Sequence, residues 1–138
     1  MQPIPAETVD RAWQELARME PTEGDQVMQG MILEQPDIVA YLVAVGEKEN
    51  LNEDEREVLL YVGAVVWYIL TQGGVSSRRA TERVVLQVEK ELAGTLGGVL
   101  DGPREGLIAA AERLAERSPQ PEVLHYVIDA VLEEEDDP

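Results

Sequence analysis

Apolar residues recur along the chain at spacings of three and four positions, the period of an amphipathic α-helix. Segments that read as strands are missing from the pattern. Proline, glycine and helix-capping residues interrupt the apolar stripes at intervals, and these interruptions mark helix ends. We therefore predict an all-α fold, a compact bundle of six to seven helices. The expected helices cover residues 5–19, 23–34, 36–46, 52–72, from 76 or 77 to 92, 103–117, and from 121 onward.

The segment 52–72 carries the clearest helix signals. Asn52 is a favourable N-cap, and the acidic run 53–55 complements the positive end of the helix dipole. Gly73 and Gly74 supply a left-handed exit. Residues 63–70 are apolar on nearly every side, so other helices should surround them. We expect this long apolar helix to be the centre of the bundle.

Two segments resemble each other. Residues 35–43, QPDIVAYLV, align with residues 120–128, QPEVLHYVI, with Gln, Pro and Tyr identical. Each follows another predicted helix across a proline break, so similar helical hairpins could flank the central helix. A proline at the first helical position followed by an acid is also a common helix opening, so convergence is the alternative to a true repeat.

Length and composition favour one domain. The chain has 138 residues, of which 44% are apolar, enough for a single core. We expect the domain to span residues 1–132 and the acidic segment 133–138 to be a frayed tail. The longest uncharged apolar stretch, residues 58–70, is shorter than the roughly 20 residues that cross a bilayer. No targeting segment is recognisable, so the expectation is a cytoplasmic protein with no membrane contact.

The net charge of −17 excludes more functions than it suggests. Residues 1–69 carry −10 (14 acids, 4 bases) and residues 70–138 carry −7 (14 acids, 7 bases). Such a balance argues against direct binding of nucleic acid or an anionic membrane. The acids could be a solvated coat, or they could steer a basic protein partner, including one whose nucleic-acid surface they imitate.

Catalytic and metal-binding chemistry has few candidates. The chain lacks Cys, and its single His, His125, lies among apolar residues of a predicted helix. Glu122 and His125 have the spacing of one di-iron motif, but such a site needs a second motif and further glutamates. A Gly-rich phosphate loop is missing because no Lys-Ser/Thr follows Gly94 to Gly98. We therefore expect no catalytic residues, no metal and no cofactor.

One locally basic stretch stands out in this acidic chain. Hydroxyl and basic side chains gather where the fifth helix is expected to begin, and free N–H groups at a helix N-terminus attract anions. Their alternative partners are the protein's own carboxylates. The candidate anion-binding residues are Ser76, Ser77, Arg78, Arg79, Arg83 and Lys90.

Four large aromatic residues could complete the core or, if exposed together, mark an interface. They are Tyr41, Trp67, Tyr68 and Tyr126. The function we predict is a non-catalytic protein–protein interaction or regulatory module, with a homodimer among the assemblies it allows. The alternatives are a ligand-binding or enzyme-like bundle using the basic stretch, and an acidic mimic of nucleic acid that inhibits a basic protein.

Overall fold

A computed structural model describes residues 2–75, 78–97 and 102–136. Within these ranges every regular element is an α-helix, which confirms the predicted all-α class. No helix in them is long and apolar enough to cross a membrane. The helices are α1 (Ala6–Ala17), α2 (Pro21–Glu34), α3 (Pro36–Lys48), α4 (Glu53–Gln72), α5 (Glu82–Leu96), α6 (Arg104–Arg117) and α7 (Pro121–Asp136).

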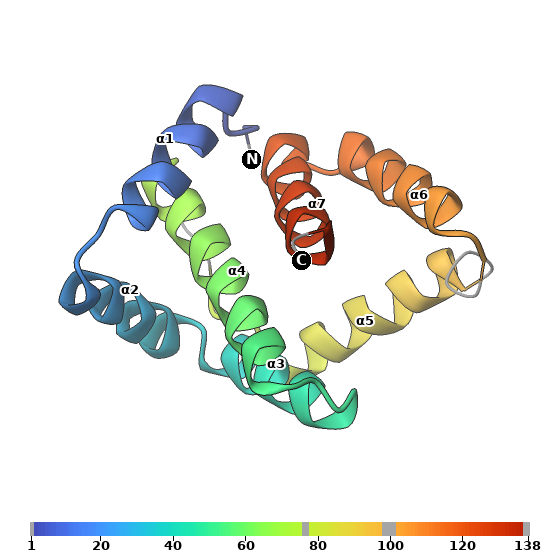
Figure 1. The fold of residues 1–138 in the computed structure, drawn as a ribbon, viewed down its shortest axis with the longest axis horizontal. Helices are drawn as coiled ribbons and strands as arrows, with labels where there is room; N and C mark the ends of the chain where they lie inside the picture. The colour runs from blue at the N-terminus through green and yellow to red at the C-terminus, as the bar shows by residue number, and fades with distance from the viewer. Residues whose placement is uncertain (1, 76–77, 98–101, 137–138) are drawn as a thin grey trace.

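Helix α4 is the centre of the bundle, as its all-round apolar surface predicts. It packs against α1, α2, α3 and α7 (Figure 1). Val65 and Ile69 are completely buried. The core is built mainly from α1 and α4, with one residue each from the segment before α1 and from α7. Its members are Ile4, Val9, Ala12, Leu16, Val65, Tyr68, Ile69 and Val123.

The ends of α4 are formed by the residues expected from the sequence. The Asn52 side chain accepts a hydrogen bond from the Glu55 N–H at 2.8 Å, and the Glu55 carboxylate accepts one from the Asn52 N–H at 2.9 Å. This reciprocal pair satisfies two of the N–H groups that a helix start leaves free. At the other end Gly74 adopts a φ of +74°, the left-handed conformation that glycine tolerates.

The predicted start of the fifth helix is wrong. Residues 78–81 are not helical, and α5 begins at Glu82 with Thr81 as its N-cap. The cause is a distant side chain. Gln35 donates from Nε2 to the Arg78 carbonyl oxygen at 2.9 Å and accepts at Oε1 from the Ala80 N–H at 2.8 Å. These two bonds hold the chain in the extended form that precedes the helix.

Three other helix boundaries differ from the prediction. Helix α2 begins at Pro21 rather than at residue 23, because Pro21 both ends the preceding helix and occupies the first helical position of the next. Helix α7 continues to Asp136, so four residues of the predicted acidic tail are helical. The end of α5 also differs, because this helix continues to Leu96 instead of ending near residue 92. The other boundaries agree with the predicted ranges to within about two residues, the usual uncertainty of helix ends.

The two similar segments make the same kind of contact. Gln120, like Gln35, precedes the proline that opens a helix. Its Oε1 accepts from the Ile4 N–H at 2.8 Å, and its Nε2 donates to the Gln2 carbonyl oxygen at 3.0 Å. We call each such pair of hydrogen bonds a glutamine clasp. One clasp ties the start of α3 to the segment before α5, and the other ties the start of α7 to the segment before α1.

Candidate functional site

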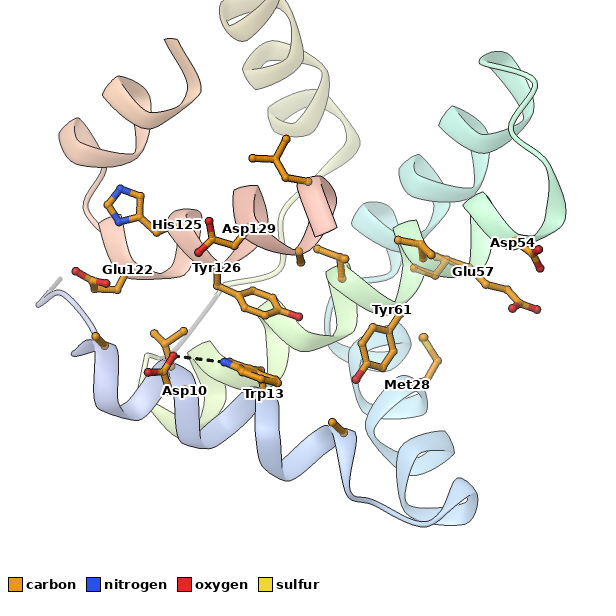
Figure 2. Close-up of a pocket in the computed structure, with 18 residues that line it drawn as sticks. Asp10, Trp13, Met28, Asp54, Glu57, Tyr61, Glu122, His125, Tyr126 and Asp129 are labelled. Atoms are coloured by element: carbon orange, nitrogen blue, oxygen red, sulfur yellow. Dashed lines mark hydrogen bonds between the residues drawn. The ribbon is translucent and has the colours of Figure 1, made fainter. Parts of the chain in front are cut away.

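An open groove of about 1540 Å³ lies between α1, α4 and α7, with Met28 of α2 at its edge (Figure 2). Most of the lining residues are apolar or aromatic, and they form the floor. The floor residues are Ala6, Val9, Trp13, Ala17, Met28, Val58, Leu60, Tyr61, Val62, Tyr126, Ala130 and Leu132. This volume exceeds the 300–1,000 Å³ typical of small-molecule sites, so the groove is large enough for a segment of polypeptide.

Three aromatic rings occupy the middle of the groove. Trp13 of α1 and Tyr126 of α7 are stacked, with ring centroids 6.2 Å apart and an interplanar angle of 25°. Both rings rest on the core. The Trp13 indole N–H donates to the Asp10 carboxylate at 3.4 Å, which fixes the tilt of the ring. Tyr61 of α4 faces them across the groove and is 45% exposed (Figure 2).

Carboxylates surround the aromatic floor. Five Asp or Glu side chains line the groove, whereas none of its lining residues is Lys or Arg. Figure 2 shows two of them on the first turns of α4, one on α1 and two on α7. They are Asp10, Asp54, Glu57, Glu122 and Asp129. We call this set the acidic rim. Because an apolar floor lowers the local dielectric, the rim favours cations more strongly than an open surface would.

The position of α7 in the groove depends on the second glutamine clasp. Gln120 fixes the first residues of α7 to Gln2 and Ile4, which lead directly into α1. Val123, one turn into α7, is buried in the core and holds the helix against α1 and α4. The exposed face of α7 then presents Glu122, His125 and Asp129, at spacings of three and four residues, to the groove.

The predicted anion site has a carboxylate of the protein itself at its centre. Ser76 and Ser77 lie outside the described residues. The Asp37 carboxylate of α3 accepts from the Glu82 N–H at 3.1 Å and lies 3.5 Å from the Arg79 guanidinium. It therefore satisfies the positive end of α5 that an anion would otherwise occupy. The other basic residues of the predicted site, Arg78, Arg83 and Lys90, are exposed.

The four predicted aromatic anchors occupy different environments. Tyr68 is buried in the core, and Tyr126 lines the groove. Trp67 packs its ring against the backbone of α2 at Gly30, and its indole N–H is buried without a hydrogen-bond partner in the structure. Tyr41 of α3 donates from its hydroxyl to the Glu89 carboxylate of α5. Since Tyr68 is buried, these four side chains do not form one exposed cluster.

Two tyrosines have altered acidity. The hydrogen bond to Glu89, together with burial and the negative charge of Glu89, raises the pKa of Tyr41 to about 12. Burial, reinforced by the nearby carboxylates of Glu15 and Glu23, raises the pKa of Tyr68 above its ordinary value. Both shifts keep the hydroxyl protonated, so these side chains act as neutral donors within the bundle.

Metal coordination has no support in the described part of the chain. Among those residues, no group of three or more His, Cys, Asp or Glu side chains is placed to hold a metal ion. Glu122 and His125, which share the spacing of a metal motif, instead lie along the groove with Asp129.

Most of the groove could not be predicted from the sequence. Asp10 and Trp13 of α1 and Tyr61 of α4 line the groove from different helices, and no local pattern shows which helices will be neighbours. A signal was nonetheless present in α7, where Glu122, His125 and Asp129 share one helix face with Tyr126 beside them.

The comparisons with known proteins add no further constraint. A scan against protein-family models finds no match, and searches of curated proteins and of solved structures find no significant match. The groove must therefore be interpreted from its own chemistry.

Proposed function

We propose that this chain is a non-catalytic interaction module whose groove binds a basic, amphipathic helix of a partner protein. The observation that carries the proposal is the combination of an aromatic and apolar floor with an acidic rim that includes no Lys or Arg. An amphipathic helix with Leu-like residues on one side and Lys or Arg on its flanks is complementary to both parts.

The shape of the groove favours a helix over an extended peptide. Its walls are the three helices α1, α4 and α7, which present side chains rather than free backbone groups. An extended peptide gains most of its affinity from backbone hydrogen bonds to a sheet edge, which helical walls do not offer. A docked helix would instead bury an apolar stripe against Trp13, Tyr61 and Tyr126, in the manner of a fourth helix joining a bundle.

The negative charge of the acidic rim should orient the bound helix and increase the rate at which it associates. The rim carboxylates lie at both ends of the groove, so a basic helix would meet negative charge along its whole length (Figure 2). Complementary charge of this kind accelerates encounter and weakens as salt is added. The scarcity of catalytic residue types, with one His and no Cys in the chain, is consistent with a binding role.

The test uses a defined peptide. A fluorescein-labelled Leu/Lys peptide of about 18 residues, five helical turns, should bind and raise the anisotropy of the label. The same pattern with Glu in place of Lys should not bind. Far-ultraviolet circular dichroism should show the Leu/Lys peptide becoming more helical in the complex.

Matched variants separate the groove from the overall charge. Asp10→Asn with Asp129→Asn removes two rim acids, and we expect affinity to fall about three- to tenfold. Glu112→Gln with Glu116→Gln removes two exposed acids of α6 that do not line the groove, and affinity should change less than about twofold. Equal losses in the two double variants would show that only net charge attracts the peptide.

A second pair of variants tests the floor. Tyr61→Ser removes an exposed ring from the groove and should weaken binding about tenfold or more, as the loss of an aromatic anchor does. Leu33→Ser removes a side chain of α2 that is 82% exposed and does not line the groove, so binding should be unchanged. If Tyr61→Ser also leaves affinity unchanged, the groove is not the binding site.

A further inference from the structure

The two halves of the chain have a similar arrangement of three helices. A fourth helix, α4, packs beside all three helices of the first half only. In both halves one helix precedes a helical hairpin, α1 before α2–α3 and α5 before α6–α7. One glutamine clasp joins the start of α3 to the segment before α5, and the other joins the start of α7 to the segment before α1. Accordingly, α3 packs on α5 and α7 packs on α1. Helix α4 lies against α1, α2 and α3, and it also contacts α7. Among the described residues, however, no helix packs against α5, α6 and α7 together (Figure 1).

The clasps define which positions of α1 and α5 are equivalent. In each case the clasped N–H belongs to the residue before the N-cap, Ile4 before Pro5 and Ala80 before Thr81. Counting from the two N-caps, Ala12 and Leu16 correspond to Val88 and Leu92. Ala12 and Leu16 are 2% and 7% exposed in the core that α1 forms with α4, but Val88 and Leu92 are 47% and 44% exposed.

The hairpin helices show the same difference. Gly46 and Val131 each lie ten residues after the proline that opens their helix. Gly46 of α3 is buried, and Arg56 of α4 lies over it so closely that an added Cβ would meet the Arg56 Cγ at 3.0 Å. Val131 of α7 is 44% exposed. Three positions that α4 covers in the first half, Ala12, Leu16 and Gly46, therefore have exposed counterparts in the second.

The total surface area is large for one folded chain. The accessible surface is 9576 Å², whereas a compact monomer of 15.3 kDa exposes about 7,100 Å². The excess of about 2,400 Å² is comparable to the area that an obligate dimer interface removes from each partner. A surface of this size is consistent with a chain that has further packing to complete.

The charge of α5 indicates what kind of partner fits there. Helix α5 contains two Lys or Arg and three Glu, a net charge of −1, and the four residues before it add Arg78 and Arg79. A basic partner would therefore gain little from this face. A second copy of the chain, which carries many acids elsewhere, meets little charge repulsion on this nearly neutral helix.

We propose that two copies of this chain dimerise through α5, each α5 taking the uncovered place beside the other. Val84, Val88 and Leu92 are spaced four residues apart and form one stripe along the helix. Antiparallel pairing about a twofold axis at Val88 sets Val84 of one copy against Leu92 of the partner subunit. The stripe is free for this contact because α5 is already held to α3 on another side, through Tyr41 and Glu89.

The first test measures mass in solution. Size-exclusion chromatography with light scattering should give twice the 15.3 kDa chain mass at micromolar concentration. Val88→Glu places a carboxylate beside its symmetry copy and should halve the mass while leaving the helical circular dichroism spectrum unchanged. Leu33→Glu, an equally charged change on α2, should leave the dimer intact. A wild-type mass of one chain, or a Val88→Glu variant that remains dimeric, overturns the proposal.

The second test locates the axis and uses the absence of Cys from the chain. Under mild oxidation Val88→Cys should form a disulfide-linked dimer, and Leu33→Cys should do so far more slowly. Equal rates for the two variants would place the contact elsewhere. Because Val88 does not line the groove, Val88→Glu should also keep its affinity for the Leu/Lys peptide, so the dimer and the proposed function can fail separately.

Discussion

Gln35 and Gln120 make the same pair of hydrogen bonds from equivalent positions in the two halves of the chain. Each side-chain amide accepts from a backbone N–H and donates to the carbonyl of the residue two positions earlier, at distances of 2.8–3.0 Å. Both glutamines are buried. Each amide therefore replaces the strand neighbour that an extended segment would otherwise need, and it does so inside an all-helical protein.

Removing either amide should destabilise the protein measurably. Gln35→Ala leaves the Ala80 N–H and the Arg78 carbonyl without their partner, and Gln120→Ala does the same to Ile4 and Gln2. We expect each change to lower the free energy of unfolding by about 1–3 kcal/mol in urea denaturation. Gln29→Ala, at an exposed position of α2, should stay within about 0.5 kcal/mol of wild type. Hydrogen exchange should accelerate at Ala80 or Ile4, respectively.

Replacing either of two glycines of α2 by alanine should change the stability of the protein in opposite directions. Nothing lies within 4 Å of a Cβ added at Gly24, so Gly24→Ala should raise stability by about 0.5–1 kcal/mol through helix propensity. At Gly30 an added Cβ would lie 2.8 Å from the Trp67 ring. The overpacking cost of about 1–3 kcal/mol should exceed the propensity gain, so Gly30→Ala should melt below wild type. Adding Trp67→Phe, with its smaller ring, should recover part of the loss.

The Tyr41–Glu89 hydrogen bond should give the protein a stability change at alkaline pH. The pKa of Tyr41 is raised to about 12 from an ordinary value of 10.0, so the unfolded chain loses this proton first. The stability advantage of wild type over Tyr41→Phe should therefore be complete below pH 10 and decline as the pH rises towards 12. Urea denaturation of both proteins across this range measures the difference.

A variant of the acceptor provides the control for the alkaline transition. Glu89→Gln removes the carboxylate that holds the Tyr41 proton, so spectrophotometric titration should show the pKa of Tyr41 moving back towards 10.0. Glu112→Gln on α6 should leave the titration unchanged. An unaltered Tyr41 titration in Glu89→Gln would mean that the hydrogen bond is not the cause of the shift.

The core should be most sensitive at the last turn of α4, where Ile69 lies. Ile69 is fully buried, and Ile69→Ala should cost about 2–5 kcal/mol, since the cavity adds to the lost burial. Leu33→Ala removes a similar side chain from a position that is 82% exposed and should change stability by less than about 0.5 kcal/mol. Thermal denaturation followed by circular dichroism distinguishes the two. Similar losses in both variants would contradict the central role of α4.

The sequence predicts the helices well where their ends are set by neighbouring residues. Asn52 and Glu55 are three positions apart and cap each other, so the start of α4 could be read directly. The start of α5 could not. Ser76, Ser77 and the arginines after them look like a helix opening, but Gln35, more than 40 residues earlier, holds Arg78 to Ala80 extended. Local patterns cannot reveal a boundary that a distant side chain imposes.

The groove could not be predicted from the sequence, for a related reason. Its rim takes acids from α1, α4 and α7, and in a chain with 28 acidic residues no single helix marks them as special. The same abundance hides Asp37, whose carboxylate lies at the N-terminus of α5 where the sequence suggested an external anion. Only the packing of helices shows which acids face one another and which cap a helix.

The two glutamine clasps also impose an order on how the protein can be completed during synthesis. Gln35 meets Ala80 after 45 further residues, but Ile4 must wait for Gln120, 116 residues later. At a synthesis rate of about 5–20 residues per second, the segment before α1 lacks its hydrogen bonds to Gln120 for roughly 6 to 23 seconds after it is made. The groove, which needs both α1 and α7, therefore cannot form until α7 has been made, and a product terminated before α7 would lack it.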